Sequence, residues 1–309
     1  MLYHTFLTAV RQQMEKRLGD SYVLTILQLP KNNGVCLDGL SIRQKGSMTA
    51  PTVCLNDFYK RFQDGMALSK ILDEITSLCE RGLKANPLDP VTLCDPDFVR
   101  PRIAYRLVNA ASNAELLKKL PHIPVLDLAK VFYLYAGQDE SGLLNMLVTH
   151  DHLKLWGMDL NTLNELAVKN TPLLFPPHIC SVDNAVLGLL LDIPFGTSAP
   201  PDPAHKSPTP LYILSNRFGV TGAACMLYPD TLKDFAELFE TDLIVLPSSI
   251  HEVLLLPDSG DRLYEELGLI VASINRTEVE AEERLSNQVY LYSRSMGRLR
   301  MAPICADPL

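Results

Sequence analysis

The apolar and polar positions in the first part of the chain predict a small unit of helices and strands. Apolar residues recur three and four positions apart over residues 3–18, which is the spacing of an amphipathic helix. Two strand-like stretches then flank Asn33-Gly34, a dipeptide that supplies the positive φ angles of a hairpin turn. The elements expected here are a helix over 3–18, strands over 22–29, 35–43 and 52–55, and helices after Asn56 and Gly65. We assign this α-β-β-β-α-α unit to residues 1–90.

The pattern over residues 91–309 predicts a larger domain in which hairpins alternate with helices. Strand 127–135 is apolar on both faces, which is typical of a central strand. Thr149 is the expected N-cap of one helix, and Pro172 is the expected end of the next. The expected strands are 102–108, 127–135, 142–149, 211–215, 223–228, 243–246, 253–256 and 289–292. The expected helices are 112–120, with a capping box at Ser112–Glu115, 149–156, 160–170, 230–239 and 261–275.

Strands that follow one another through short hairpins favour antiparallel pairing over a doubly wound parallel sheet. The predicted fold class is therefore α+β: a small N-terminal α/β unit plus a larger domain with a mainly antiparallel sheet and helices packed on it. The proline-rich stretch 194–210 cannot hold a regular helix or sheet, so we expect a loop or linker there.

One faint internal similarity lies in this larger domain. Tyr105–Asn109 and Tyr212–Asn216 share the pattern Y-x-L-x-N, and each precedes a helix and then a pair of apolar strands. Either a duplicated β-α-β-β unit or a chance match of strand-like pentapeptides would produce this pattern.

Composition narrows the class of protein. The chain has 309 residues, of which 47% are apolar, enough for a sizeable core. A net charge of −8 disfavours a nucleic-acid binder, which carries a clustered basic face. The seven cysteines are scattered without a C-x-x-C pair, so a reducing cytoplasm fits better than a disulfide framework or a zinc site. The N-terminus lacks the pattern of a signal peptide, and no apolar run approaches the roughly 20 residues of a membrane span.

Five short motifs along the chain together resemble a bacterial family of unknown function, DUF5688. They are N-N-G-V-x-L-x-G-L at Asn32–Leu40, H-L-x-x-W-G at His152–Gly157, A-x-x-N-T at Ala167–Thr171, G-A-A-C-M-L-Y at Gly222–Tyr228 and L-P-S-S-I-H-E-V at Leu246–Val253. The resemblance covers nearly the whole chain except the proline-rich stretch. The second region is also similar, more weakly, to another uncharacterised family, DUF1444. Neither resemblance implies an activity, a cofactor or a catalytic residue.

The densest group of reactive side chains lies in Asp242–Pro257, where two apolar runs enclose Ser248, Ser249, His251 and Glu252. A serine nucleophile needs a base within hydrogen-bond reach, yet side chains this close on an extended segment diverge. Ser249 to Glu252 also has the form S-x-x-E, so Ser249 can cap a helical turn that Glu252 closes. The alternatives are a cap, a polar hairpin loop and a functional site.

Cys225 suggests a second chemistry, because small neighbours in G-A-A-C-M-L-Y allow the close approach of a substrate or a strand. A thiolate beside the His251 imidazolium is a strong nucleophile, which Asn216 or Glu252 would help by orienting the ring and Ser249 by stabilising charge. The competing interpretation is structural, because cysteine is often buried and the residues around it look like core.

Two further groups are weaker candidates. His150-Asp151-His152 has the residue types of a metal site, but it lacks the i, i+4 spacing of helical ligands, and a helix start capped by Thr149 explains it as well. None of the familiar glycine-rich phosphate-binding motifs occurs. We therefore predict no cofactor and no metal.

The leading hypothesis on function is a non-enzymatic, cytoplasmic binding or regulatory protein with a protein or small-molecule partner and no membrane. The alternative is a thiol-dependent hydrolase or transferase that uses Cys225 and His251. A nucleic-acid-linked role in defence or mobile elements is the third hypothesis, which the acidic composition disfavours. The sequence leaves open the ligand, the oligomeric state and whether the protein is an enzyme.

Overall fold

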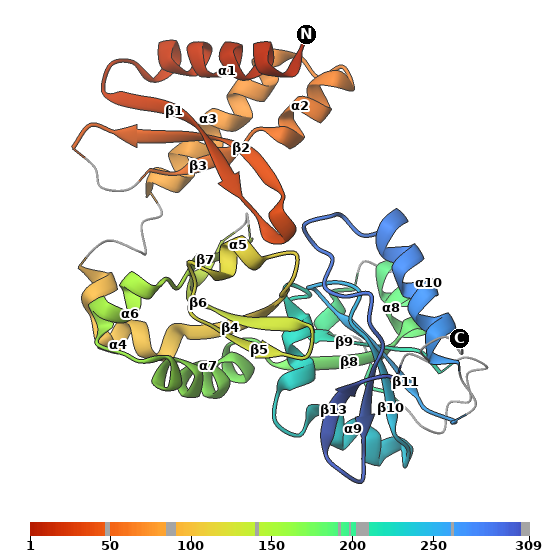
Figure 1. Cartoon of the computed structure of the whole chain (residues 1–309). Helices are drawn as coiled ribbons and strands as arrows, with labels where there is room; N and C mark the ends of the chain where they lie inside the picture. The colour runs from red at the N-terminus through yellow and green to blue at the C-terminus, as the bar shows by residue number, and fades with distance from the viewer. Residues whose placement is uncertain are drawn as a thin grey trace, which may run out of the picture. The chain divides into compact units, whose positions relative to one another are not determined.

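The computed structural model describes residues 1–46, 50–84, 91–139, 142–190, 193–197, 199–201, 210–260 and 263–303. The chain divides into two compact units, Met1–Leu93 and Cys94–Leu309. The first contains one antiparallel sheet and the second contains two, with helices packed on them (Figure 1), so the predicted α+β class is confirmed. Residues 198 and 202–209 of the proline-rich stretch and the predicted boundary at residues 87–90 lie outside the described residues.

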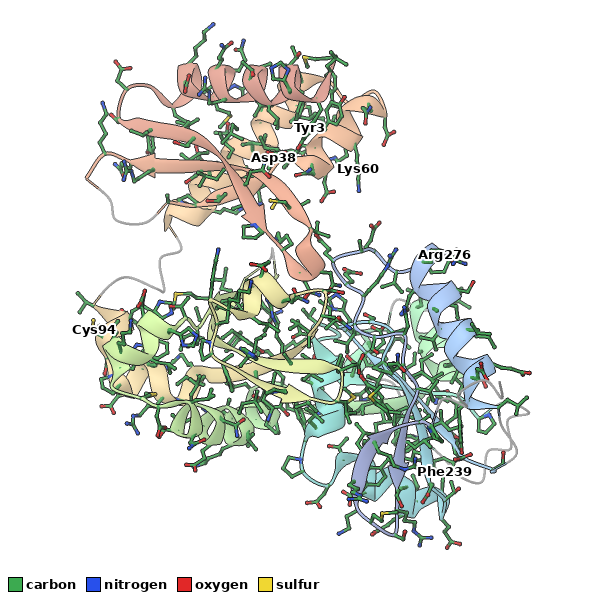
Figure 2. The ribbon with its side chains drawn as sticks, in the orientation of Figure 1. Tyr3, Asp38, Lys60, Cys94, Phe239 and Arg276 are labelled. Carbon is green, nitrogen blue, oxygen red and sulfur yellow. The ribbon has the colours of Figure 1, made fainter. Side chains whose placement is uncertain are left out.

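The N-terminal unit is a three-stranded antiparallel sheet covered by helices, as predicted. The sheet has the order β1-β2-β3, and Asn33 and Gly34 take positive φ angles of 59° and 71° in the turn of the hairpin. Tyr3 of the first helix donates a hydrogen bond to Asp38 of the second strand (2.8 Å; Figure 2). The elements are α1 (Tyr3–Leu18), β1 (Tyr22–Pro30), β2 (Cys36–Gln44), β3 (Thr52–Cys54), α2 (Asn56–Gln63) and α3 (Leu68–Lys84).

The first sheet of the larger unit is built around β6, the strand predicted to be central. One edge of β6 pairs with β4, and the other pairs with β5 and then β7, all antiparallel. The strands are β4 (Ile103–Asn109), β5 (His122–Val125), β6 (Leu128–Asp139) and β7 (Gly142–Leu147). The helices are α4 (Pro96–Val99), α5 (Ala114–Leu117), α6 (His150–Trp156) and α7 (Leu160–Leu174).

Helix α7 continues past Pro172, so the prediction that this proline ends the helix is wrong. Two neighbouring side chains hold the last turn in place despite the missing N–H donor. Thr171 Oγ1 donates to the carbonyl of Ala167 (2.6 Å) and accepts the N–H of Tyr105 (3.1 Å). The amide of Asn170 donates to a carbonyl of β4. Tertiary bonds therefore override the local preference of proline.

The second sheet of this unit has six antiparallel strands in the order β13-β12-β10-β11-β9-β8. Helix α9 packs on one face, where Phe235 and Phe239 contact Tyr212, and α10 packs on the other, against Leu254 (Figure 1). The strands are β8 (Pro177–Ser181), β9 (Tyr212–Asn216), β10 (Leu243–Leu246), β11 (Val253–Pro257), β12 (Tyr290–Ser293) and β13 (Arg298–Met301). The helices are α8 (Val182–Leu190), α9 (Thr231–Phe239) and α10 (Tyr264–Thr277).

The predicted strand 223–228 is instead a short 3-10 helix, η5 (Gly222–Leu227). Both edges of β9 are already paired, with β8 and β11, so this apolar segment has no free edge to join and packs beside the sheet. The packing is tight, because a Cβ added to Gly222 would collide with the hydroxyl of Ser215 and the carbonyl of His251.

The predicted capping box at Ser112–Glu115 is not formed. Asn113 is the N-cap of α5, without a side-chain cap bond. The backbone N–H of Ser112 donates instead to Oδ1 of Asn109 (2.9 Å). Asn109, at the end of β4, therefore holds this turn, and no cap of α5 does.

The two segments with the Y-x-L-x-N pattern have the same strand order. In each, the first strand pairs with the third and the third pairs with the second: β4-β6-β5 in one sheet and β9-β11-β10 in the other. Asn109 and Asn216 also use Oδ1 in the same way, to accept a backbone N–H of the turn after their strand. This shared order and role are what a duplicated β-α-β-β unit produces.

The start of β12 and the segment before it join the two sheets of this unit. Asp127, between β5 and β6, accepts hydrogen bonds from Ser286 Oγ (2.6 Å) and from the hydroxyl of Tyr290. Asn109, at the end of β4, donates to the carbonyl of Leu285 (3.0 Å). None of the helices in the described part of the chain combines the length and the apolar character that a bilayer crossing requires.

Candidate functional site

The turn after β9 is held by Asn216, a residue predicted to orient a catalytic histidine. Asn216 is buried, and its side chain bonds within the turn. Oδ1 accepts the N–H of Phe218 (2.9 Å), and Nδ2 donates to the carbonyl of Val220 (2.7 Å). Thr221, which follows, has a positive φ of 53°, a conformation that is uncommon for a β-branched residue. Asn216 thus fixes the turn that positions Thr221.

Residues 247–252 form a polar hairpin loop between β10 and β11, one of the alternatives expected from the sequence. Ser249 Oγ accepts the N–H of His251 (2.9 Å), a local bond typical of serine in turns. Ser249 also bonds to the carboxylate of Glu252. Burial raises the pKa of Glu252, although nearby His251 and the bond from Ser249 both favour its charged form. The loop therefore holds a carboxylate that is costly to ionise.

The ring of His251 is fixed by a partner at each nitrogen. Nδ1 accepts the backbone N–H of Thr221 (3.2 Å), and Nε2 lies 3.3 Å from Oε1 of Glu283. Because Nδ1 is an acceptor, the neutral ring carries its proton on Nε2 and donates it to Glu283. The structure thus brings Ser249, His251 and Glu252 into one loop and adds Glu283, which the sequence analysis did not consider.

Cys225 lies in η5, fully buried among tyrosines. Its thiol bonds to the side chain of Tyr228 and has Tyr105 and Tyr133 as electrostatic neighbours. Burial raises the pKa of the thiol to about 12. None of the hydrogen bonds between described residues joins Cys225 to the ring of His251. The catalytic roles considered for these residues stay predictions.

Arg106 of β4 is the most unusual charged group in the unit. Its Nε is sealed from solvent and has no hydrogen-bond partner among the described residues. Burial lowers the pKa of the guanidinium, and its one ionisable neighbour within the described chain is Tyr133, opposite Ala104 on β6. Part of the Arg106 surface stays accessible, so the side chain is deeply enclosed but not shut off from solvent.

Arg106 begins a connected series of polar groups that ends at the hairpin loop. Its electrostatic neighbour Tyr133 bonds through the phenol to the side chain of Thr221. The N–H of Thr221 reaches His251, and His251 reaches Glu283. The series runs from β4 through β6 and the turn after β9 to the loop, and no carboxylate stands at its Arg106 end in the described residues. The guanidinium of Arg106, at this end of the series, has the donor geometry to bind the oxygens of an anion.

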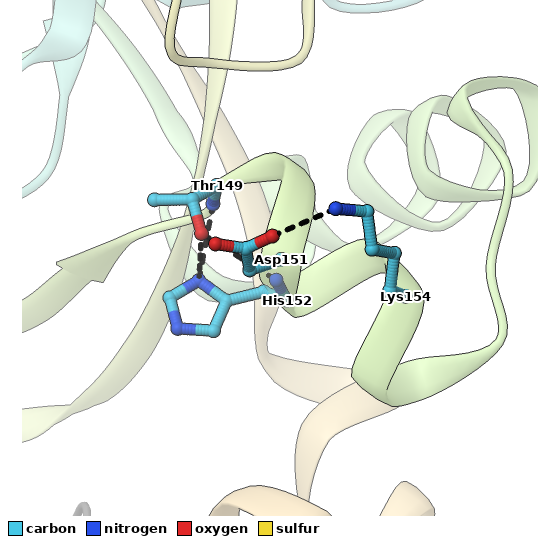
Figure 3. A network of polar contacts seen from close by, with 4 residues as sticks. All are labelled: Thr149, Asp151, His152 and Lys154. Carbon is cyan, nitrogen blue, oxygen red and sulfur yellow. Dashed lines mark hydrogen bonds and ion pairs between the residues drawn. The ribbon is translucent and has the colours of Figure 1, made fainter.

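The other histidine candidate, His150-Asp151-His152, begins α6 (Figure 3). Thr149 caps this helix as predicted: its Oγ1 accepts the N–H of His152 (3.4 Å), and His152 Nδ1 accepts the N–H of Thr149 (3.0 Å). The His152 ring stacks on Trp156, and Asp151 pairs with Lys154 (2.9 Å). Both side chains thus serve the helix start. No cluster of three or more potential metal ligands occurs in the part of the chain that the structure describes.

These features define an α+β protein of two units, with a duplicated strand arrangement in the larger one and a polar series that begins at a buried arginine. The chain belongs to DUF5688, a family of unknown function, whose profile matches residues 3–294. The resemblance based on the sequence motifs is thereby confirmed. Comparison with curated proteins and with solved structures gave no match.

Proposed function

We propose that this chain is a non-enzymatic binding protein of the bacterial cytoplasm that holds a small ligand through an anionic group, a carboxylate or a phosphate, at Arg106. The observation that carries the proposal is the largely buried guanidinium of Arg106, whose Nε has no hydrogen-bond partner and which has no carboxylate partner among the described residues. The described cysteines form no disulfide with one another, which supports a reducing compartment.

Burying a charged group in a protein costs free energy. A guanidinium removed from water loses several kcal/mol of hydration unless an anion replaces the water. Arginine in proteins is accordingly paired, and its planar fork of donors matches carboxylate and phosphate oxygens. At Arg106 the protein supplies only the neutral phenol of Tyr133 nearby. A bound oxyanion would complete the pair.

The chemistry of the neighbouring residues supports binding over thiol catalysis. A thiol with a pKa of about 12 is almost wholly protonated near neutral pH, and a protonated thiol is a poor nucleophile. The ring of His251 is engaged at both nitrogens, by Thr221 and Glu283, and does not bond to this thiol. A net charge of −8 disfavours a nucleic acid as the anionic ligand.

The test uses inorganic phosphate and acetate as probes and the variant Arg106→Met. We expect phosphate or acetate at millimolar concentration to raise the Tm of the wild-type protein and to give saturable heat in calorimetry, because the ligand binds only the folded state. Arg106→Met removes the fork of donors and keeps an apolar stem, so it should abolish both effects. Arg298→Met, at an exposed arginine of β13, is the control for loss of one positive charge.

A second measurement separates ligand binding from a structural role. If the folded protein holds Arg106 without a partner, Arg106→Met should leave the free energy of unfolding unchanged or raise it by roughly 1–3 kcal/mol. A large loss of stability would show that Arg106 already has a partner in the protein. Equal ligand responses in the wild type and Arg106→Met, or none in either, would exclude the proposed site.

A further inference from the structure

His251 joins the hairpin loop between β10 and β11 to the turn that follows β9. Its backbone carbonyl accepts the hydroxyl of Ser215 (2.6 Å), and Nδ1 of its ring accepts the backbone N–H of Thr221 (3.2 Å). The other ring nitrogen, Nε2, lies 3.3 Å from the carboxylate of Glu283. The ring is therefore the part of this junction that can gain or lose a proton near neutral pH.

Protonation of the ring has opposite effects at its two nitrogens. The neutral ring donates from Nε2 to Glu283 and accepts at Nδ1 from Thr221. In the protonated ring both nitrogens are donors, so the contact with Glu283 becomes a salt bridge, whereas the N–H of Thr221 faces a second donor. Rotating the ring gives Thr221 no acceptor, because an imidazolium has none. The bond to Thr221 thus requires a neutral His251.

Two carboxylates lie near the ring. Glu283 contacts Nε2, and Glu252 follows His251 in the loop, where the histidine favours its charged form. Attraction between opposite charges is mutual, so both carboxylates also favour the imidazolium. Glu283 is held in this place by its backbone, because its carbonyl accepts the N–H of Ile250 (2.8 Å).

The arginines near this junction are engaged with other groups. Arg284, which follows Glu283, donates to the carbonyl of Val279 (2.9 Å). Arg217, in the turn after β9, has His178 of β8 as its electrostatic neighbour. Among the described residues, the charges that act on the ring from both sides of the junction are therefore mainly negative.

The bond to His251 holds Thr221 in an unusual backbone conformation. Its positive φ of 53° is strained for a β-branched residue and persists only where neighbouring contacts hold it. Asn216 holds the preceding part of the turn by donating to the carbonyl of Val220 (2.7 Å). The N–H of Thr221 itself is held by the ring. We therefore expect Thr221 to leave this conformation when the ring is protonated.

A movement of Thr221 also affects β6. The side chain of Thr221 bonds to the phenol of Tyr133, a buried residue of that strand. This bond is lost when Thr221 moves. A change of charge in the hairpin loop thus reaches the other sheet of this unit.

We propose that His251 is a pH-sensitive switch: its neutral ring holds the turn 216–221 against the hairpin loop, and its protonated ring releases Thr221. This inference does not depend on the ligand proposed at Arg106, because it uses only contacts within the protein.

The experiment is hydrogen exchange of the Thr221 amide, followed by NMR in protein with isotope-labelled threonine between about pH 5 and pH 8, where histidine changes charge. The protection factor is the intrinsic exchange rate at each pH divided by the measured rate. We expect the protection factor of Thr221 to fall roughly fivefold or more as the pH decreases through this range, the factor that one hydrogen bond contributes. Thr241 is the internal control and should keep its protection, because its N–H donates to the backbone carbonyl of Ala236 (3.2 Å).

Three variants test whether the His251 ring causes the change. His251→Asn places Oδ1 close to the position of Nδ1 and does not titrate, so Thr221 should stay protected at every pH. His251→Ala has no acceptor, so Thr221 should have the low protection of the acidic wild type at every pH. Glu283→Gln keeps a hydrogen-bond partner at Nε2 but removes a charge that favours the imidazolium, so Thr221 should lose protection at a lower pH than in the wild type.

Three results would overturn the inference. A wild-type protection factor of Thr221 that stays constant would show that the turn does not respond to the charge of His251. A loss of protection that also occurs in His251→Asn would assign the change to another group, such as Glu252. A nitrogen spectrum of the histidine rings that places the hydrogen of neutral His251 on Nδ1 would exclude the bond from Thr221 on which the switch depends.

Discussion

At the scale of single residues, the reactivity of Cys225 is the most direct test of the site. Burial raises the pKa of its thiol to about 12, so iodoacetamide should label it at neutral pH only after the protein unfolds. Cys36 and Cys94 are exposed and should react in the native protein, which provides an internal control. Peptide mass mapping after timed labelling measures all three. Fast native labelling of Cys225 that is lost in His251→Ala would support the thiol enzyme instead.

Glu252 should make stability depend on pH. Burial raises its carboxyl pKa in the folded protein above the unfolded value of 4.5, so folding favours the protonated form. The contribution of this carboxyl group to the free energy of unfolding is fully present below pH 4.5, and it is lost as the pH rises through the raised pKa. Glu252→Gln cannot ionise, so it should gain stability relative to the wild type as the pH rises above 4.5.

Urea unfolding at several pH values measures this difference. The matched control is Glu237→Gln, which removes one carboxylate from the exposed surface of α9. A difference between Glu252→Gln and the wild type that stays constant over the range would mean that the carboxyl group ionises as easily in the folded protein as in the unfolded one.

Some residues of the site could be identified from the sequence and others could not. Ser249, His251 and Glu252 were found because their types cluster in a short stretch. Arg106 was not, because one arginine inside the predicted strand 102–108 has the pattern of a side chain that faces water. Only the packing of neighbouring elements encloses it, and that packing is not encoded locally. The bonds that Asn216 makes within its turn were also missed, because they depend on how the backbone of residues 216–220 folds back and not on residue type.

At the scale of elements, the start of α6 tests how far local capping contributes to stability. Thr149→Ala removes the side-chain bond to the N–H of His152 and should lower the free energy of unfolding by about 1 kcal/mol. Thr149→Ser keeps the hydroxyl and should cost less. Urea unfolding of both variants checks the prediction. Equal losses of stability in Thr149→Ala and Thr149→Ser would show that the methyl group, which both variants lack, is responsible and not the capping hydroxyl.

Most helices and hairpins could be predicted because their apolar spacing or turn residues are local signals. The hairpin of β10 and β11 is an example, since two apolar runs flank a polar loop. The segment at η5 could not, because an apolar run of six residues fits a strand equally well until the edges of β9 are known to be paired. Strand β8 was missed for the related reason that its few residues, Pro177–Ser181, show no clear alternation.

At the scale of the whole molecule, the larger unit is organised by two segments of the same strand order. Each supplies an asparagine that ends its first strand, and the two sheets are joined where Asn109 reaches Leu285. The proposed site uses one segment for Arg106 and Tyr133 and the other for Thr221 and its neighbours. A site formed from two segments far apart in the sequence explains why no single short motif identified it.

The division into units gives the last prediction. All members of the polar series, from Arg106 to Glu283, belong to the unit Cys94–Leu309, and the apolar core of α1 to α3 lies within Met1–Leu93. Because each unit has its own core, the fragment 94–309 should fold alone and unfold cooperatively in urea. It should also keep the response to phosphate or acetate that Arg106→Met removes. A fragment that folds but no longer responds would show that residues of the N-terminal unit take part in binding the anion, and one that does not fold would show that the two cores depend on each other.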